Sequence, residues 1–483
     1  MASVPPDRPA TSRPLDAPAR TPLQAQIVAR FTALITSGRL PAGARVPSLR
    51  TLATELGVAR GTVQAAYDRL VGEGLLEARG PAGTFVAAVT TGSAPARTQA
   101  LRASPSAAPD ADPLLDLDAP HPPALRMGLP ALDAFPRKLW SRLVGRQARA
   151  MGTAALLKPE PAGLPRLREA IAVHLHRARG VAAQAGQVFI VPGYEAGLAL
   201  TVAALLRAGD TAVVECPGFP PTPRLLGRLG LQVVHAPVDG EGLQVGPVRQ
   251  QAPGARLVVV TPTHQSPGGM ALTLARRRAL LDWAAHDGPW IVEDDYDGEY
   301  HFRGPPLPAL KSLDRDGRVI HAGTFSKVLF PGLRLAYVVV PPACVPAFEA
   351  AARTTAHGGC PSLTQAVVAD FIEQGHLGRH VRRMRTLYAQ RRAWLAEALA
   401  PLAPRGVRTV LGDGGMHLLI ELPAGSDDRA CARRAQAAGL GVLPLSAWRG
   451  QGTGPPALLA GFTNITSATV ARQLVEGLGV AIG

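Results

Sequence analysis

Residues 323–337 read "GTFSKVLFPGLRLAY", and the lysine within this stretch decides how the chain is interpreted. The chain has 51 Lys and Arg residues, of which only four are lysines, namely Lys138, Lys158, Lys311 and Lys327. Lysine can lose its proton near neutral pH and attack a carbonyl as a free amine, which arginine cannot do. A Schiff-base lysine at position 327 is therefore the first hypothesis, and a surface ammonium is the alternative.

The length and composition indicate a globular protein of several domains. With 483 residues, 47% of them hydrophobic, the chain is too long for one core and predicts two or three domains. No run approaches the roughly 18 uninterrupted apolar residues of a membrane span, and residues 1–20 lack the apolar core of a signal peptide. We expect residues 1–20 to form a disordered arm. The four cysteines show no CxxC spacing, which predicts neither a zinc site nor disulfides, and hence a reducing, cytoplasmic location.

The distribution of residue types along the chain predicts two folded parts. Residues 88–112 break all apolar periodicity with Ala, Ser, Pro and Thr, and are expected to form a linker between a unit at 21–87 and a larger one at 113–483. The net charge of +15 is compatible with a nucleic-acid partner. Charge alone is weak evidence, because an arginine-rich composition can be shared by a whole proteome.

The N-terminal unit reads as three helices followed by a hairpin. Ser48 is placed to cap the helix "SLRTLATELGV", and Gly57 joins it to the next helix, which would expose Arg60, Thr62 and Gln64 on its first turns. The stretch "LLEARGPAGTFVAAV" predicts two short strands joined by a Gly/Pro turn. This order is typical of a winged helix-turn-helix that binds DNA. A three-helix protein-interaction module is the alternative.

The phrases "GRLPAGARVPSLRTLATELGVARGTVQAAYDRLVGEGLLEARGPAGTFV" resemble the winged-helix domain of GntR-type bacterial regulators. This resemblance implies that Arg50 and Arg60 contact phosphates and bases, and that Thr62 contacts the DNA backbone at the start of the recognition helix. It also places the wing tip at Gly83 and Thr84. The expected DNA-binding set is Ser48, Arg50, Arg60, Thr62, Gln64, Gly83 and Thr84.

The large unit alternates short apolar runs with amphipathic stretches. Runs such as "QVFIVPG", "DTAVVE", "RLVVVTP", "PWIVEDD" and "AYVVVPP", spaced by helical stretches, predict an α/β fold with a mostly parallel sheet covered by helices.

Pyridoxal phosphate (PLP) chemistry needs an acid at the pyridine nitrogen, a stacked aromatic ring and a phosphate cup, and each has a candidate. The apolar run in "IVEDDYDGEY" ends in three carboxylates, at the edge of a sheet where open α/β folds bind ligands. "ECPGFP" offers an aromatic ring on a turn, and Gly193 opens a helix whose N-terminus would attract phosphate. Singly these signals are weak, since an acidic strand end is usually solvated or metal-binding and a glycine before a helix is mostly a turn. The candidates are Glu293, Asp294, Asp295, Phe219, Gly193, Thr324, Ser326 and Arg334.

In their joint order these residues resemble the fold-type I aminotransferases. More narrowly, "EDDYDGEY", "GTFSKVLFPGLRLAY", "RLREAIAVHLHRARGV", "THQSPGG" and "FIEQGHLGRHVRRMR" resemble the MocR-type regulators, which fuse a GntR-like winged helix to an aminotransferase-like domain. The resemblance implies a PLP Schiff base on Lys327 and a phosphate held by Thr324, Ser326 and Arg334.

The same resemblance assigns the other cofactor contacts. Asp294 would pair with the pyridinium nitrogen, Tyr296 would lie near the phenolic oxygen, and Phe219 would stack on the ring. Asp294 is preferred to Asp295 because side chains alternate along a strand, which puts Asp294 on the face of Tyr296. His264 and Gln265 are expected nearby without an assigned role.

Four departures from the family pattern concern the cofactor and ligand sites. Lys158 stands where the family has a tyrosine that reaches the partner subunit's phosphate, and Tyr194 and Glu195 replace a small residue and a glutamine. The usual "HQFPTG" is "HQSPGG", with Ser266 and Gly268.

The fourth departure is at Leu459, which replaces the arginine that binds a substrate carboxylate in aminotransferases. Arg449 is a candidate substitute for that arginine. The expected protein is thus a dimeric, PLP-binding transcription regulator that binds operator DNA and senses PLP or an amine or amino acid. The alternatives are a working aminotransferase with a fused winged helix, and a regulator that has lost its cofactor.

Overall fold

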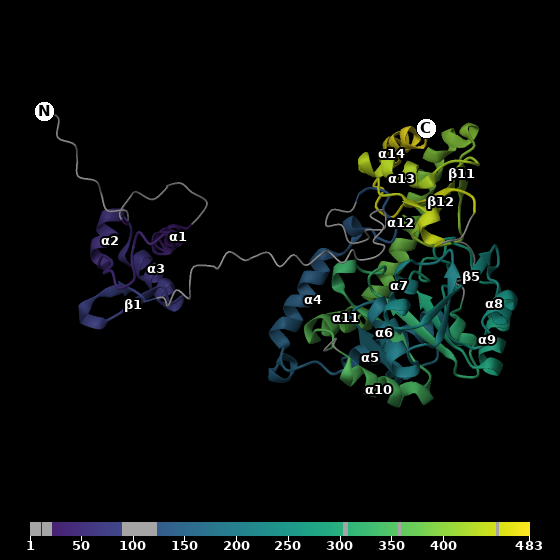
Figure 1. Cartoon of the computed structure of the whole chain (residues 1–483), viewed down its shortest axis with the longest axis horizontal. Helices are drawn as coiled ribbons and strands as arrows, with labels where there is room; N and C mark the ends of the chain where they lie inside the picture. The colour runs from purple at the N-terminus through teal and green to yellow at the C-terminus, as the bar shows by residue number, and fades with distance from the viewer. Residues whose placement is uncertain (1–10, 12–21, 89–122, 303–307, 356–358, 451–453) are drawn as a thin grey trace. The chain divides into compact units, whose positions relative to one another are not determined.

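The computed structural model describes residue 11 and residues 22–88, 123–302, 308–355, 359–450 and 454–483. The chain divides into two compact units, residues 1–109 and 110–483 (Figure 1). The arm predicted at residues 1–20 and the linker predicted at 88–112 lie almost wholly outside the described residues.

The N-terminal unit has the predicted order of helices and hairpin. Its elements are α1 (Leu23–Thr36), α2 (Leu49–Leu56), α3 (Arg60–Gly72), β1 (Leu76–Ala78), a 3₁₀ turn (Gly80–Ala82) and β2 (Thr84–Val86). Strands β1 and β2 pair antiparallel and form the expected wing. One apolar cluster holds the unit together, and its fully buried members include Ile27, Phe31, Leu52, Val63 and Leu70.

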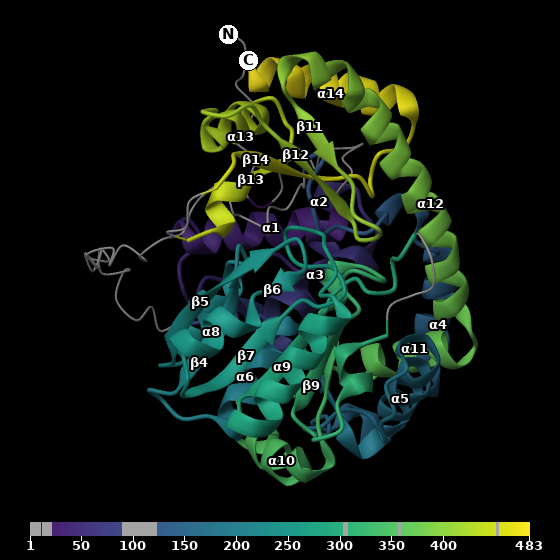
Figure 2. The ribbon, with the colours of Figure 1, turned by 90° about the vertical axis from the view of Figure 1, so that its right-hand side faces the viewer.

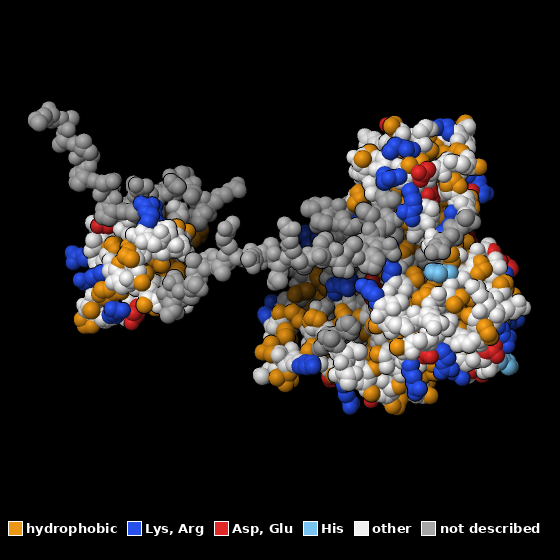
Figure 3. Space-filling view, in the orientation of Figure 1, with side chains coloured by type: hydrophobic (Ala, Val, Ile, Leu, Met, Phe, Trp, Pro, Cys, Tyr) orange, Lys and Arg blue, Asp and Glu red, His pale blue; other side chains and the backbone are white. Residues whose placement is uncertain are grey.

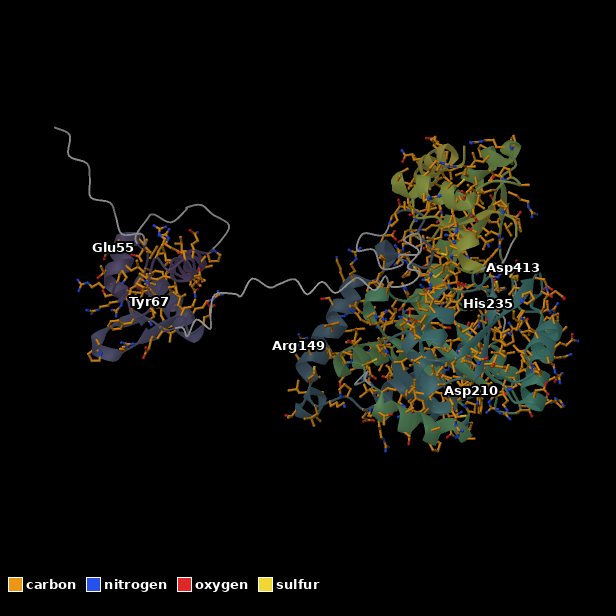
Figure 4. All side chains as sticks on the ribbon, viewed as in Figure 1. Glu55, Tyr67, Arg149, Asp210, His235 and Asp413 are labelled. Atoms are coloured by element: carbon orange, nitrogen blue, oxygen red, sulfur yellow. The ribbon has the colours of Figure 1, made fainter. Side chains whose placement is uncertain are left out.

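Local sequence signals fix the turns of this unit. The Ser48 side chain accepts a hydrogen bond from the Thr51 amide and caps α2, as predicted. Gly57 ends α2 with φ of 64°, a left-handed conformation that glycine adopts without strain. Tyr67, labelled in Figure 4, packs edge-on against Phe31 and donates its hydroxyl hydrogen to the Pro47 carbonyl. Tyr67 thus fixes α3 against α1 and against the segment that precedes α2.

The large unit is built on an eight-stranded sheet that confirms the predicted α/β class. Its strands are β3 (Val188–Val191), β4 (Thr211–Cys216), β5 (Gln232–Asp239), β6 (Gly242–Leu243), β7 (Ala255–Val260), β8 (Trp290–Asp295), β9 (Val319–Thr324) and β10 (Ala336–Val339). They lie in the order β3-β10-β9-β8-β7-β4-β5-β6. The five strands from β9 to β5 are parallel, whereas β10 runs antiparallel to both β3 and β9.

Helices cover both faces of this sheet, as the strand sequences require (Figures 1 and 2). Alternate residues of β3 enter different clusters: Phe189 and Val191 pack with α6, α7 and α10, while Val188 and Ile190 pack with α5 and α11. The helices are α4 (Arg137–Ala150), α5 (Pro165–Arg179), α6 (Tyr194–Leu205), α7 (Pro221–Arg228), α8 (Val245–Gln251), α9 (Leu274–Asp287), α10 (Val345–Thr354), α11 (Ser362–Glu373) and α12 (His376–Leu399).

A second, four-stranded sheet, which the sequence analysis did not predict, follows α12. It contains β11 (Arg408–Val410), β12 (His417–Glu421), β13 (Leu443–Pro444) and β14 (Ala457–Gly461), all antiparallel. Helices α12, α13 (Asp428–Ala437) and α14 (Ala468–Ile482) cover one face of it (Figure 2). Leu458 and Ala460 point into that helical core, whereas Leu459 points to the opposite face. Among the described helices, none is long and apolar enough to cross a membrane.

Candidate functional site

The candidate site lies where several strands of the large sheet end. In register, Asp294 of β8 lies opposite Ala322 of β9, and Thr324 lies opposite Ala336 at the start of β10. Val191, at the end of β3, also lies opposite Ala336. The loop that carries the lysine connects β9 to β10, and it therefore lies at the edge where open α/β sheets bind ligands.

Lys327 is half-buried in this loop and is oriented by backbone contacts from distant segments. Its Nζ atom donates a hydrogen bond of 2.7 Å to the carbonyl oxygen of Gly128. The hydroxyl of Tyr300 donates to the carbonyl oxygen of Lys327 at 3.2 Å. The side chain and the backbone of the lysine are thus both held in place.

The structure separates the two neighbouring carboxylates of β8, as strand alternation predicts. Asp295 forms a buried ion pair of 2.7 Å with Arg179. Asp294 makes no hydrogen bond or ion pair with the described residues, although it is only 9% exposed. Burial raises the pKa of Asp294 well above its usual value, the carboxylates of Asp295 and Asp297 raise it further, and the positive charge of Lys327 lowers it. Asp294 is therefore a carboxylate available to a cationic ligand near Lys327.

A cationic side chain lies against the N-terminus of α6. A Cβ atom on Gly193 would lie 3.4 Å from Nη2 of Arg334, so the guanidinium packs directly on this glycine. Arg334 has φ of 49°, a left-handed conformation rare for residues other than glycine, and it makes no ion pair with the described residues. Thr324 lies close by on β9, and its hydroxyl accepts a hydrogen bond from the Ser326 amide. These groups can hold an anion.

Aromatic rings form another wall of the site. The ring of Phe219 lies 6.1 Å from that of Tyr194 and 5.9 Å from that of Trp448, between centroids. The Tyr194 hydroxyl lies 3.0 Å from that of Thr222. Tyr194 lines one small pocket with Asp294 and Thr324. Burial raises the pKa of Tyr194 well above its usual value, and the charge of Asp294 raises it further.

Tyr296, expected near the cofactor's phenolic oxygen, is half-buried, and His264 and Gln265, expected nearby without a role, are buried. The hydroxyl of Tyr296 completes no hydrogen bond within the described chain. Nδ1 of His264 forms a hydrogen bond of 2.8 Å with the carboxylate of Asp297. The polar partner of this histidine is therefore Asp297 and not Lys327. Gln265 joins its loop to the loop after β4, because its Nε2 donates to the Pro217 carbonyl.

Lys158 and Glu195 both have exposed side chains. Neither forms an ion pair with the described residues of this chain. Lys158 follows two exposed leucines, Leu156 and Leu157, which are 74% and 68% exposed. A contact between Lys158 and Glu195 would therefore have to come from a second subunit.

Arg449, the candidate for the missing carboxylate-binding arginine, already has a partner. Its Nη2 donates to the carbonyl oxygen of Pro455 at 2.7 Å. Leu459 is fully buried beside Trp448, Met127 and the edge of Phe219. Leu459, which replaces the carboxylate-binding arginine of aminotransferases, therefore lies within an apolar cluster.

Figure 3 shows basic side chains on the surface of the N-terminal unit, and its described exposed arginines are Arg39, Arg45, Arg50, Arg60, Arg69 and Arg79. Arg50 on α2 and Arg60, the first residue of α3, are exposed and form no ion pair with the described residues. Thr62 is half-buried, and the Gln64 amide donates to Asp68 at 2.7 Å. Arg50 and Arg60 are therefore the predicted residues best placed to meet phosphate.

Arg45 lies at the wing, although it was not among the residues predicted to bind DNA. A Cβ atom on Gly83 would lie 2.9 Å from Nε of Arg45, and Arg45 forms a backbone bridge with Phe85 of β2. Arg45 is exposed, so it adds a cation beside the wing tip formed by Gly83 and Thr84. Arg45 is the one charged residue of the phrase "GARVPS", which marks it as a candidate DNA contact. Its contact with the wing could not be predicted, because Arg45 and Gly83 are far apart in the sequence.

Comparisons with known proteins agree with both units. Residues 23–86 match the family "Bacterial regulatory proteins, gntR family", and residues 134–459 match "Aminotransferase class I and II". The chain is 38% identical to the probable rhizopine catabolism regulatory protein MocR of Rhizobium meliloti, over 89% of this chain and 88% of that protein. It is 33% identical to the pyridoxine biosynthesis transcriptional regulator PdxR of Corynebacterium glutamicum, over 94% and 95% of the two chains.

Solved structures resemble the large unit. A Pyrococcus horikoshii kynurenine aminotransferase superposes with a TM-score of 0.67 at 28% identity, covering 74% of this chain and 90% of that one. An α-aminoadipate aminotransferase from Thermus thermophilus, solved with N-(5'-phosphopyridoxyl)-L-leucine, gives a TM-score of 0.67 at 27% identity, covering 74% and 91%.

Proposed function

This chain belongs to the MocR-type family, in which a GntR winged helix is joined to an aminotransferase-like domain, and on that premise we propose that it is a PLP-binding regulator of transcription. In this proposal residues 21–87 bind operator DNA in the cytoplasm, residues 88–112 link the domains, and residues 113–483 bind the cofactor. The single observation that carries the proposal is that Lys327 lies close enough to lower the pKa of Asp294, a buried carboxylate without a hydrogen-bond or ion-pair partner among the described residues.

The residues present fit PLP. Asp294, buried without a partner among the described residues, suits the cationic nitrogen of a protonated pyridine ring. The guanidinium of Arg334 against Gly193 suits the phosphate, with the hydroxyls of Thr324 and Ser326 beside it. Bound PLP supplies an aldehyde carbon that reacts with primary amines.

The chain's own residues would then prepare the site for this chemistry. The Gly128 carbonyl holds the Lys327 amine in one direction. Asp294 keeps its negative charge best when a positive charge lies beside it, because burial alone favours its neutral form. Phe219 would cover one face of the ring, between Tyr194 and Trp448.

The winged helix would bind DNA mainly through charge. Arg45, Arg50 and Arg60 are exposed and have no acidic partner among the described residues, which leaves their charges available to phosphates. The two units would be coupled in a homodimer. The second copy would bury the exposed side chains of Leu156 and Leu157. Lys158, the next residue, would then lie at the cofactor site of the second copy. An amine or PLP that binds the large unit would change the spacing of the DNA-binding heads.

Cofactor loading tests this proposal most directly. Adding PLP to the purified protein should produce a visible absorbance band, and borohydride reduction should leave the added mass on the peptide that contains Lys327. Lys327→Ala should lose both signals, whereas Lys138→Ala, a change at an exposed lysine, should keep them. A reducible band that survives in Lys327→Arg would show that the attachment site is assigned wrongly.

Transaminase turnover is the alternative function. It would be measured with amino acids and oxo acids under steady-state conditions, and we expect none above background, because Leu459 stands at the position of the carboxylate-binding arginine. Turnover at ordinary enzyme rates would favour the aminotransferase instead.

A further inference from the structure

Helix α4 of the large unit carries a row of positive charges on its exposed side. The helix contains five basic residues and no acidic one. Lys138 and Arg142 are four residues apart, and Arg149 follows Lys138 after about three helical turns, so the three side chains share one face. All three are exposed and form no ion pair with the described residues. Arg149, labelled in Figure 4, lies on the last turn of the helix.

The first turns of α12 carry a second row. Arg379, Arg382 and Arg383 have the spacing of one helical face and are exposed, and none of them forms an ion pair with the described residues. Arg379 donates to the Gln374 carbonyl, which leaves its charge uncompensated. Glu397 is the only acidic residue of α12, and it lies about 21 Å along the helix axis from Arg383.

Aromatic packing places the two rows beside each other. The ring of Phe371, on α11, lies 6.0 Å from that of Trp140 on α4 and 5.6 Å from that of His376 on α12, between centroids. Burial lowers the pKa of His376, and the positive charges of Arg379 and Arg142 lower it further. Guanidinium groups from both helices therefore lie near one imidazole. We call the two rows together the basic strip, which consists of Lys138, Arg142, Arg149, Arg379, Arg382 and Arg383.

The acidic side chains of α11, the helix that packs against both α4 and α12, are already paired. Asp370 forms ion pairs with Arg146 at 2.5 Å and with Arg166 at 2.6 Å, and its side chain is only 3% exposed. Glu373 pairs with Arg166 as well. These carboxylates neutralise arginines outside the basic strip, so they leave the charges of the strip available to an external anion.

A regular row of uncompensated cations fits a regular row of phosphates. The row on α4 is about 16 Å long, and one strand of B-form DNA carries about five phosphates over that length. The guanidinium group also matches the geometry of phosphate oxygens. A second copy of the chain is a poor occupant of this surface, because the net charge of +15 makes two copies repel each other. DNA is the better occupant, since the N-terminal unit of the same chain keeps it close.

We propose that the basic strip binds the phosphate backbone of the DNA that flanks the operator, while the winged helix holds the operator itself. The contact has no sequence preference, because contacts to phosphates carry no direct sequence information. This inference rests on the proposed DNA-binding role of the N-terminal unit and adds a second DNA-binding surface to the chain. The large unit alone binds duplexes weakly and without selecting the operator.

The test compares two lengths of DNA. An operator is first selected from random duplexes with the wild-type protein. One probe contains the selected site alone, and the other extends it by about 30 base pairs on each side, roughly 100 Å of duplex. Binding of the full chain would be measured by fluorescence anisotropy over a range of salt concentrations. We expect wild type to bind the extended probe at least about tenfold more tightly than the short one, with a steeper salt slope.

Two variants remove charges from the two rows separately. Arg142→Ala combined with Arg149→Ala changes α4, and Arg382→Ala combined with Arg383→Ala changes α12. Each variant should lose most of the gain from the flanking DNA and should lower the salt slope on the extended probe by up to about 1.8, or 0.9 for each lost phosphate contact. Both should bind the short probe like wild type, which also shows that they fold. The second variant keeps the test decisive if the first does not fold.

A matched control removes the same charge elsewhere. Arg256→Ala combined with Arg278→Ala changes two exposed arginines that form no ion pair with the described residues. Arg278 is on α9, which lies on the side of the large unit away from α4 (Figure 1). This variant should keep the full gain from the flanking DNA. An equal loss in the control would overturn the inference, because total charge and not the basic strip would then explain the gain.

The other outcomes are also distinct. If wild type selects no duplex, the proposed function fails and the inference fails with it. If it binds an operator but gains nothing from the flanks, the inference alone is overturned. A gain that appears only after Asp110, Asp112, Asp116 and Asp118 are changed to Asn would assign the strip to the chain's own acidic stretch.

Two further measurements cover the remaining occupants. An unchanged gain in the strip variants, together with a changed subunit number in sedimentation, would assign the strip to a second copy. An unchanged gain together with lost binding to phosphatidylglycerol vesicles would assign it to a membrane surface. Either result would overturn DNA as the occupant.

Discussion

The amine of Lys327 bonds to the carbonyl oxygen of Gly128, a residue 199 positions earlier in the chain. A Cβ atom on Gly128 would lie only 2.8 Å from that amine, and the glycine has φ of 78°. The contact therefore depends on the absence of a side chain at position 128.

Gly128→Ala should weaken PLP binding. The methyl group would push the lysine amine aside, and a left-handed alanine costs about 1–2 kcal/mol of strain. Absorbance titration should show at least about a tenfold loss of PLP affinity. Gly152→Ala is the matched control, since a Cβ there meets nothing within 4 Å and φ is negative. Equal PLP affinity in both variants would contradict the steric role of Gly128.

DNA binding should depend on Arg50 and Arg60 but not on Arg69. The first two have no acidic partner among the described residues, whereas Arg69 is paired with Glu73 at 2.8 Å on the same helix as Arg60. Alanine at position 50 or 60 should weaken operator binding and lower the salt slope by about 0.9 for each phosphate that is no longer neutralised. Arg69→Ala should change neither, and PLP uptake should be the same in all three. Wild-type affinity of the isolated large unit for the operator would contradict the assignment of DNA binding to the winged helix.

Lys158 and Glu195 should be energetically coupled in the dimer, where the lysine of one subunit would reach the α6 N-terminus of the other. Glu195→Gln should tighten PLP binding because it removes a negative charge near the phosphate, and Lys158→Tyr should weaken it. The double mutant should depart from additivity by at least about 0.5 kcal/mol in an absorbance titration. Additive effects would show that both side chains point to solvent.

The pH dependence of stability should include a contribution from Glu215, at the end of β4. Burial raises the pKa of this carboxyl from 4.5 to about 7, against hydrogen bonds from Thr261 and Gln265 that lower it. A folded pKa above the unfolded one means that the protonated form is favoured by folding, so this stability is present below about pH 4.5 and is lost as pH rises through 7.

Glu215→Gln should remove this pH dependence. The pKa change from 4.5 to about 7 corresponds to a change in the free energy of unfolding on the order of 3 kcal/mol. The unfolding temperature of the variant, relative to wild type, should therefore rise between pH 5 and pH 8 in scanning calorimetry. Glu397→Gln, at an exposed position, should follow wild type at both pH values. A constant difference between Glu215→Gln and wild type would mean that Glu215 stays ionised throughout.

The elements that the sequence predicted well are those with strong local signals. Five apolar runs became β3, β4, β7, β8 and β10, because each is long enough to fill a strand buried on both faces. Strand alternation separated Asp294 from Asp295, and the Ser48 cap and the Gly57 turn fixed the start and end of α2.

What the sequence could not predict depends on partners far along the chain. The run "AYVVVPP" fits a parallel or an antiparallel strand equally well, so the direction of β10 had no local signal. The short strands of the second sheet were not recognised between helical stretches. The interactions of Arg45 with Gly83 and of Lys327 with Gly128 join distant segments for which no spacing rule exists.

The position of β10 has a consequence for synthesis of the protein. Strand β3 lies at the edge of the sheet, and among the described strands it pairs with β10, so it has no strand partner until residue 339 has left the ribosome. Gly193 follows β3 directly and Arg334 precedes β10, so the anion cradle closes only at the same moment. A nascent chain that stops before β10 therefore contains these groups but lacks the strand that joins the end of β3 to the loop of Arg334. Because such distant pairing is slow, β3 is expected to be a site where chaperones bind the growing chain.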